Sequence, residues 1–190
     1  MKVPVNAKRV YIIAEAGVNH NGVFVLAKKL VRAAADAGAD AVKFQAFRAD
    51  ALATAEAKKA FYQKKTTGRK GSQLQMLKAL ELDEAAHLKL KAYAKQLRLD
   101  FLSSPFDEES ARMLIQKIGV RRLKVPSGEI TNAPLLLELA SSGLPVILST
   151  GMSTLEEIRE ALGVLAFGYT RAVSQKPSRV AFQKAFKSRR

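Results

Sequence analysis

The amino-acid sequence predicts an α/β protein with a parallel sheet, and two observations predict it. Short apolar runs of strand length alternate with longer segments of helical period, in the order β-α-β-α-β-α-β-α-β-α. Polar residues also gather where each apolar run ends. Because a parallel strand is reached through a right-handed crossover, usually a helix, such alternation favours parallel strands. It leaves open whether the sheet is doubly wound or closes into a (β/α)8 barrel.

The elements follow from apolar periodicity and from stop signals. Gly38 is a natural stop for the first helix, and Ser153 with Glu156 has the spacing of a capping box. Residues 48–80 form a long polar insertion with short helical pieces. The expected strands cover residues 10–16, 40–47, 99–104, 121–129 (with an exit loop) and 144–150. The expected helices cover residues 25–38, 83–97, 107–119, 133–143 and 153–166.

Composition limits the classes of protein that this chain can represent. It has 190 residues, a net charge of +15 and no Cys, which excludes disulfides, thiolate catalysis and cysteine-based zinc sites. No apolar run is long enough for a membrane span and no secretory signal is visible, so a cytoplasmic protein is expected. The basic excess is concentrated in residues 163–190, which contain no acid. We therefore expect a domain at residues 1–162 and a basic tail at residues 163–190.

The polar residues at the strand ends are the candidate functional groups. Active groups of parallel α/β folds gather where strands end and βα loops begin. Each of the expected strands ends in such residues. They are Glu15, Asn19 and His20 after the first strand, Lys43 and Gln45 in the second, Ser103 and Ser104 in the third, Lys124, Ser127 and Glu129 in the fourth, and Ser149 in the fifth.

Strand parity indicates what these groups bind. Side chains alternate between faces, so Lys43 lies opposite to Val42 and Phe44, and Lys124 opposite to its apolar neighbours. If the apolar side chains pack on helices, both lysines point into a barrel. Two ammonium groups there require an anion, and a phosphate or carboxylate ligand would neutralise them.

Plainer interpretations compete with these assignments. Glu15 pairs with Lys43 in one of them, and Asn19 is then only a turn former. For His20 two interpretations stay open: a structural loop residue or a functional group. His87, between lysines on an expected helix, is expected to be a solvated surface histidine. No metal site follows from the spacing of the two His and the acids.

Five segments carry a resemblance to a known family. They are "IIAEAGVNHNG", "AGADAVKFQ", "FLSSPFD", "LKVPSGEITNAPLL" and "PVILSTGMSTLEEI". In order and spacing they resemble the N-terminal part of the sialic acid synthase (N-acetylneuraminate synthase) family, over residues 10–162. The resemblance implies a (β/α)8 barrel of the TIM type. It also implies condensation of phosphoenolpyruvate with N-acetylmannosamine or a related N-acetylated sugar, with release of phosphate.

The resemblance also implies roles for the candidate residues. Glu15 would manage protons, and Gln45 would lie beside the aldehyde end of the sugar. Glu129 would contact substrate or position a lysine. The side chains that would hold phosphoenolpyruvate are Lys43, Lys124, Ser127 and Ser149.

The chain also departs from the family pattern. About five βα units are visible where the barrel has eight. The family implies a divalent metal, Mn2+ or Mg2+, held by histidines on later strands that this chain lacks, and a small C-terminal antifreeze-like domain. The first and fifth strands are expected to be unpaired edges, which favours a homo-oligomer.

Two further functions stay open. One is a non-catalytic truncated barrel that acts as a binding or assembly partner. The other is nucleic-acid binding through the basic tail, where Phe182 and Phe186 are spaced for one face of an amphipathic helix. This second function is the weaker one, because the sequence contains no recognisable nucleic-acid-binding module.

Overall fold

The strands run in one direction, as the sequence predicts. The computed structural model describes residues 10–59, 71–170 and 176–188. Within these ranges the strands pair in the orders β1-β2-β3 and β4-β5, always parallel, and β4 lies beside β3. The described strands do not close into a barrel, so the fold is an open part of a barrel-type sheet. The strands are β1 (Ile13–Gly17), β2 (Ala41–Ala46), β3 (Asp100–Pro105), β4 (Leu123–Val125) and β5 (Val146–Leu148).

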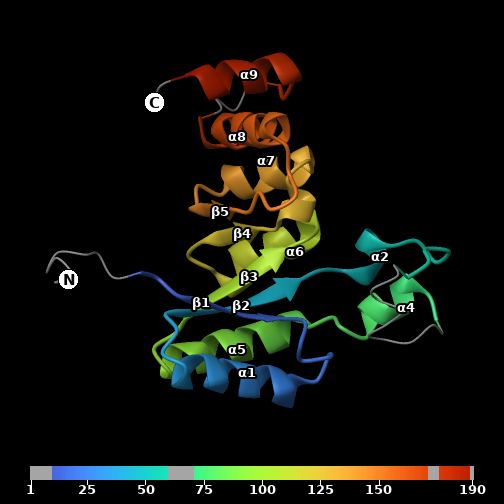
Figure 1. Ribbon diagram of the computed structural model, residues 1–190, viewed down its shortest axis with the longest axis vertical. Coiled ribbons are helices and arrows are strands. Elements are labelled where there is room, and N and C mark those ends of the chain that lie inside the picture. Colours follow the sequence, from blue (N-terminus) through green and yellow to red (C-terminus); the bar gives the residue numbers. More distant parts are fainter. Residues whose placement is uncertain (1–9, 60–70, 171–175, 189–190) are drawn as a thin grey trace, which may run out of the picture.

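The helices form two groups on the outside of the strands. In Figure 1, α1 and α5 lie together below β1 and β2, and α7, α8 and α9 stack one after another above β4 and β5. Short helices α2 and α4 extend to one side, within the polar insertion. The helices are α1 (Phe24–Asp36), α2 (Ala49–Leu52), α4 (Gln73–Lys78), α5 (Glu84–Gln96), α6 (Glu108–Arg112), the π-helix η1 (Met113–Ile118), the 3-10 helix η2 (Ser127–Glu129), α7 (Ala133–Ser141), α8 (Leu155–Thr170) and α9 (Arg179–Lys187).

Alternation along β2 divides the core from the candidate site. Val42 and Phe44 are fully buried, whereas Lys43 and Gln45 on the other face are only partly covered. The Phe44 ring stacks on Phe101 of β3 with centroids 5.8 Å apart. The apolar face of β2 therefore belongs to the core between sheet and helices, and the polar face is left for function.

The expectation that His87 is a surface residue is wrong. Its side chain is fully buried, and its ring meets Phe101 edge-on at 6.2 Å. The buried residues of α5 are His87, Leu90 and Ala94, which share one helix face at spacings of three and four. The lysines near His87 in sequence lie on other faces, so adjacency along the chain misled the prediction.

The start of α8 differs from the expected capping box by one residue. The backbone N–H of Glu157 donates to Thr154 Oγ1 at 3.2 Å, and the Thr154 N–H donates to the Glu157 carboxylate at 2.7 Å. The reciprocal pair is thus Thr154 and Glu157, not Ser153 and Glu156. Both pairs have the required spacing, so spacing alone does not decide which pair caps the helix.

Ordered structure continues past residue 162. Helix α8 runs on to Thr170, and α9 packs on it through Phe182, whose ring meets Phe167 edge-on at 5.2 Å. Gly163 allows this approach, because a Cβ on it would lie 2.9 Å from the Phe182 carbonyl oxygen. In the described part of the chain, no helix is both long and apolar enough to cross a membrane.

The two histidines stay neutral in the core. His20, in the loop after β1, is fully buried 6.0 Å from the Phe44 ring. Burial lowers the pKa of both histidines below 6.5; the nearby His87 lowers that of His20 further, and the Asp83 carbonyl partly opposes the change at His87. Neither Nε2 has a hydrogen-bond partner among the described residues. Protonation of either ring therefore favours the unfolded chain.

We expect acid to destabilise the protein through these rings. An unfolded histidine gains its proton near pH 6.5, whereas the folded pKa values are lower, so the free energy of unfolding falls as the pH drops below about 6.5. The slope reaches at most about 1.4 kcal/mol per pH unit for each histidine. Denaturant unfolding at pH 7.5 and 5.5 measures how the free energy of unfolding changes with pH. His87→Asn, which keeps a donor near the Asp83 carbonyl, should give a shallower slope, and equal slopes would contradict the assignment.

The contact of α8 with α9 gives a second prediction. An ordinary helical Gly→Ala change stabilises by about 0.5–1 kcal/mol. We expect Gly163→Ala to do the opposite, because the new methyl would meet the Phe182 carbonyl at 2.9 Å. Hydrogen exchange should show faster exchange of the α9 amides, with α5 as an internal reference. A variant more stable than the wild type with unchanged α9 protection would refute this packing.

Candidate active site

Glu15 and Lys43 meet at the carboxyl ends of neighbouring strands. The register of β1 and β2 sets them directly opposite each other, and their carboxylate and ammonium groups form an ion pair. The Lys43 side chain is 13% exposed and that of Glu15 is 51% exposed, so the lysine lies deeper. The simple pairing of these two residues is therefore real, and it places the carboxylate at the mouth of the site.

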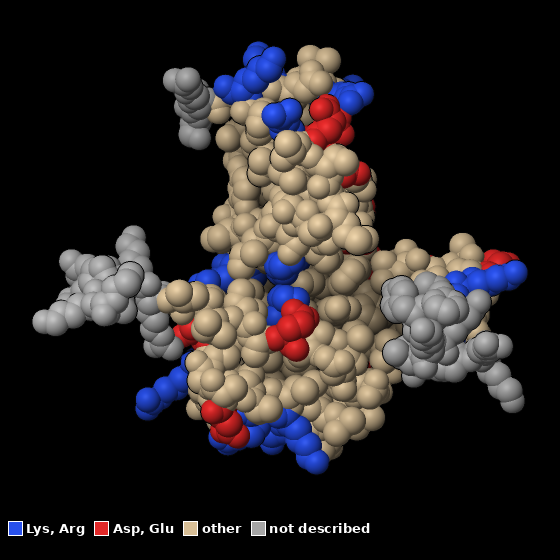
Figure 2. Space-filling model, in the orientation of Figure 1, with Lys and Arg blue, Asp and Glu red and all other residues tan. Residues whose placement is uncertain are grey.

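Lys124 shares the electrostatic environment of this pair. It projects from β4, and its Nζ donates to the Val125 carbonyl oxygen at 2.8 Å. Its pKa is lowered by burial and then by the charge of Lys43, against an opposing effect of Glu15. The three groups thus lie on one side of the strands, with two ammonium groups to one carboxylate. Figure 2 shows basic and acidic atoms together near the middle of the molecule, at the level of β1, β2 and β4.

Gln45 lies beside the Glu15 carboxylate, with Gly17 between them. Gly17 has φ +54°, and a Cβ on it would lie 3.3 Å from Glu15 Oε1 and 3.8 Å from Gln45 Nε2. Gly17 also marks the register shift at the end of β1. A side chain there would occupy the space between the acid and the amide, which glycine leaves open for a ligand.

The exits of β4 and β5 bring the serines to Lys124. The Val125 carbonyl oxygen that accepts the Lys124 proton also accepts the backbone N–H of Ser149 at 3.0 Å. Ser127, at the start of η2, has its Oγ 3.6 Å from the Cβ position of Gly151 in the loop after β5. Lys124, Ser127 and Ser149 therefore surround the paired ends of these two strands.

Glu129 has a contact that organises the backbone. Its Oε2 accepts the side-chain amide of Asn132 at 2.8 Å, and Asn132 in turn caps α7 through the backbone N–H of Leu135. Glu129 thus helps to fix the turn between β4 and α7, two residues after Ser127. Its partner is Asn132 and not a lysine, so the two roles expected for Glu129, contact with substrate or positioning of a lysine, stay predictions.

Ser104 is among the polar strand-end residues that the sequence singles out, but the sequence analysis gives it no role in the site. The register of β2 and β3 places it opposite Gln45, so both point to the same face. Ser104 is 1% exposed, and its hydroxyl has no hydrogen-bond partner in the described ranges. A buried unpartnered donor beside the candidate site points to a missing acceptor. Side-chain alternation applied to the third strand would have predicted that Ser104 shares the face of Gln45.

Of the two substrate-binding residues expected in the loop after β1, His20 lies apart from Lys43. His20 packs beside Phe44 on the helix side of β2, the face opposite Lys43. Its Nδ1 accepts the backbone N–H of Gly22 at 3.0 Å, which holds the turn. Asn19 is exposed in the same loop, and its backbone N–H donates to Ala16. The contacts of His20 are those of a loop anchor.

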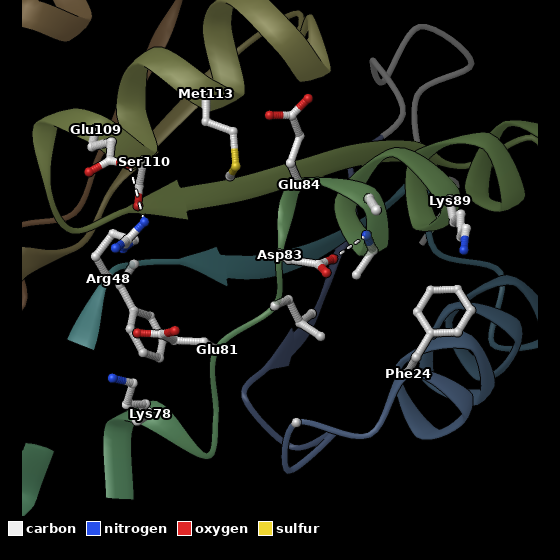
Figure 3. A pocket seen from close by; sticks show the side chains of 15 residues that line it. Phe24, Arg48, Lys78, Glu81, Asp83, Glu84, Lys89, Glu109, Ser110 and Met113 are labelled. Atoms are coloured by element: carbon white, nitrogen blue, oxygen red, sulfur yellow. Dashed lines mark hydrogen bonds and ion pairs between the residues drawn. The ribbon is translucent and has the colours of Figure 1, made fainter. Parts of the chain in front are cut away.

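A cavity of about 750 Å3 lies beside α1 and α5, and neither Lys43 nor Lys124 lines it. Figure 3 shows Phe24, Glu84 and Met113 around it, with Arg48 reaching Glu109 at 3.3 Å. Its carboxylates are largely engaged in the fold. Glu81 accepts the Ala49 N–H at 2.5 Å, and Asp83 caps α5. The strand ends differ from this cavity, because there two lysines share one carboxylate and the buried Ser104 hydroxyl has no partner among the described residues.

The residues present do not form a site for a divalent ion. Across the described ranges, no three His, Cys, Asp or Glu side chains converge on one point. The remaining positions contain none of these residue types. The metal that the family resemblance implies therefore has no ligand set here, and no step below depends on it.

A partial parallel α/β barrel with two lysines and a carboxylate at the carboxyl ends of its strands defines the class of this protein. Residues 30–182 match the NeuB family, and the chain belongs to that family. It is 55% identical over 158 residues to N,N'-diacetyllegionaminic acid synthase of Campylobacter jejuni, covering 83% of this chain and 47% of that protein. The corresponding synthase of Legionella pneumophila is 52% identical over 164 residues, which cover 86% and 46%.

A solved structure shares the fold. It is N-acetylneuraminic acid (sialic acid) synthetase from Leptospira borgpetersenii in complex with citrate, which is 35% identical with a TM-score of 0.72. The match covers 86% of this chain and 52% of that one. The chain thus spans about half the length of the relatives that it matches.

The shared environment of the two lysines can be tested by titration. We expect Lys43→Met to raise the pKa of Lys124 towards its ordinary value, and Glu15→Gln to lower it, because each change removes one charge that acts on it. NMR of lysine labelled at the side-chain carbon measures both shifts. Lys29→Met on α1 serves as a control that leaves the value unchanged. A Lys124 that responds to neither variant would separate it from the Glu15–Lys43 pair.

Proposed function

We propose that this chain carries the phosphoenolpyruvate-binding part of a sugar acid synthase. The proposed reaction condenses phosphoenolpyruvate with N-acetylmannosamine or a related N-acetylated sugar and releases phosphate. One observation carries the proposal: Lys124, partly buried, responds to the charges of both members of the Lys43–Glu15 ion pair, so two ammonium groups and one carboxylate act on one another. Membership of the NeuB family, whose named relatives are sugar acid synthases, supports it.

The charge of the site fits phosphoenolpyruvate. This substrate carries a phosphate and a carboxylate on a three-carbon frame, and two lysines with one paired acid leave positive charge for it. Ser127 and Ser149, at the exits of β4 and β5, are the proposed donors to phosphate oxygens; the Ser127 hydroxyl near Gly151 and the Ser149 backbone bond to Val125 support this. The Ser104 hydroxyl, buried without a partner in the described chain, is a further donor on the same face.

The chemistry then follows the polarity of the site. The methylene carbon of the enol attacks the sugar aldehyde and forms the new carbon–carbon bond, and the aldehyde oxygen takes up a proton. Water adds to the resulting cationic C2 and loses a proton. The tetrahedral intermediate then collapses to the keto acid, with cleavage of the C2–O bond and release of phosphate. Glu15, half-exposed and held by Lys43, is placed to exchange these protons. Gln45 lies beside it, toward the aldehyde.

A second candidate function is that of a non-catalytic binding or assembly partner. The observation that favours it is the open sheet, since within the described strands β1 pairs only with β2 and β5 only with β4. Val10 and Ile12, before β1, are 72% and 51% exposed. Such an edge favours association with a further copy or another part of a barrel. A homo-oligomer is accordingly part of the proposal.

Binding of phosphoenolpyruvate tests the first function directly. We expect Lys124→Met to weaken binding about ten- to a hundredfold, because a charge-assisted contact is lost. Lys29→Met, which removes an exposed lysine of α1, is the matched control and should bind as the wild type does. Isothermal titration calorimetry measures the dissociation constants of the wild type and the two variants. A wild type that binds no phosphoenolpyruvate would overturn the proposal in favour of the non-catalytic function.

Turnover tests the role of Glu15. With N-acetylmannosamine as acceptor, Glu15→Gln should keep phosphoenolpyruvate binding within a few-fold and lower the rate of phosphate release about 100- to 10,000-fold, as expected for loss of a proton-transfer group. The rates of the wild type and of Glu15→Gln are compared under conditions in which the wild type shows measurable turnover. A variant that forms product as fast as the wild type would remove Glu15 from the mechanism.

A further inference from the structure

A second positively charged cavity lies at the opposite, amino-terminal end of the strands. It has a volume of about 400 Å3 and opens between the C-terminal end of α5 and the start of β4. Chemistry in parallel barrels gathers at the carboxyl ends of strands, so this cavity is separate from the candidate active site. Its charged lining residues are Lys91, Lys95, Arg98, Asp100, Arg121 and Arg122.

The single acid of this cavity is already engaged. Asp100 accepts the Tyr11 hydroxyl at 2.5 Å and pairs with Arg122 at 3.6 Å. Burial and the hydrogen bond to Asp100 raise the pKa of Tyr11 to about 12, so the hydroxyl keeps its proton at neutral pH. The Arg122 guanidinium also lies over the Tyr11 ring, 4.8 Å from its centre. These contacts engage the one acid of the lining, so the other basic groups of the lining have no acid among the lining residues to pair with.

The remaining basic groups carry an excess of positive charge. Lys91 donates to the Ile118 and Gly119 carbonyls at the end of η1. The side chains of Arg98 and Arg121 are exposed and form no ion pair with any described residue. All 17 acids of the chain lie within the described ranges, so no carboxylate side chain elsewhere in the sequence supplies a partner.

Arg98 occupies a backbone position that normally selects glycine. It follows Leu97 at the end of α5 with φ +60°. Gly38, Gly119 and Gly143 hold the same left-handed conformation after α1, η1 and α7. A residue with a Cβ is strained in this conformation. Arginine therefore offers no backbone advantage over the glycines that follow α1, η1 and α7, and it differs from them only by its side chain. Strain of this kind, held at a charged cavity, points to a functional side chain.

We propose that this cavity binds a small anion carrying phosphate, as a second site apart from the reaction centre. Guanidinium groups suit phosphate because they donate two parallel hydrogen bonds to its oxygens. The volume lies within the range of small-ligand pockets, about 300–1,000 Å3. The groups surround a concave space and do not form an extended stripe, which favours a small anion over a nucleic acid. The proposal does not depend on the function proposed for the carboxyl end.

Pyrophosphate binding to the full chain tests this site. We expect Arg98→Gly and Arg121→Gln each to weaken binding about tenfold or more, through loss of a charge-assisted contact. Arg98→Gly should also raise the melting temperature of the free protein by roughly 2–4 °C, because glycine relieves the positive φ. A variant that is more stable and yet binds worse cannot be explained by misfolding. Unchanged pyrophosphate affinity in Arg98→Gly would overturn the proposal.

Controls separate this site from the active site and from general surface charge. Because phosphate is also proposed to bind beside Lys124, Lys124→Met should lose only the contribution of the carboxyl end, and the loss caused by Arg98→Gly should persist in the Lys124→Met background. Lys29→Gln, on the exposed face of α1, should bind as the wild type does. If Lys29→Gln weakens binding as much as Arg98→Gly, the effect is diffuse charge and the proposal fails. It fails as well if a single-stranded oligonucleotide binds more tightly than pyrophosphate and loses affinity in the same variants.

Discussion

The parallel pairing of β1 with β2 is the constraint on which the candidate site depends. It sets Glu15 opposite Lys43 and turns both side chains to the face that Phe44 does not use. The same alternation, carried across β3, adds Ser104 to that face, and Lys124 of β4 lies near enough to respond to the charges of Lys43 and Glu15. Since the strands all run in one direction, their carboxyl ends meet at one edge. One geometric rule thus gathers charges that lie more than a hundred residues apart in sequence.

Charge is distributed between the two ends of the strands. At the carboxyl end, burial and Lys43 lower the pKa of Lys124, so the charged state of that lysine is already disfavoured before an anion arrives. At the amino-terminal end, Asp100 is neutralised locally by Arg122 and Tyr11, and the neighbouring arginines keep their charge. Both ends therefore carry an excess of positive charge in different forms: partly buried ammonium groups at one and exposed guanidinium groups at the other.

The helix layer stabilises this arrangement with unusual core residues. His20 and His87 take places that apolar side chains usually hold, beside Phe44 and Phe101. They tie the loop that follows Glu15 to the packing of α5, so the position of the candidate site and the neutrality of these rings are coupled through β2. At the other end of the chain, α9 extends the packed layer beyond α8 by means of the close approach at Gly163.

The sequence by itself determined the order of elements, the parallel direction of the strands and the face on which Lys43, Gln45 and Lys124 lie. These features follow from periods of two and 3.6 residues, which depend only on local backbone geometry. The sequence could not determine that His87 is buried, because its helix face is chosen by the packing of α5 on β3. Nor could it choose between Ser153 and Thr154 as the cap, since both have the same spacing to an acid. Only the tertiary structure showed that Ser104 is a buried, unpartnered donor on the face of Gln45. It alone also brought Arg98 and Arg121 to one cavity, because contacts between distant segments arise from packing and leave no periodic trace in the chain.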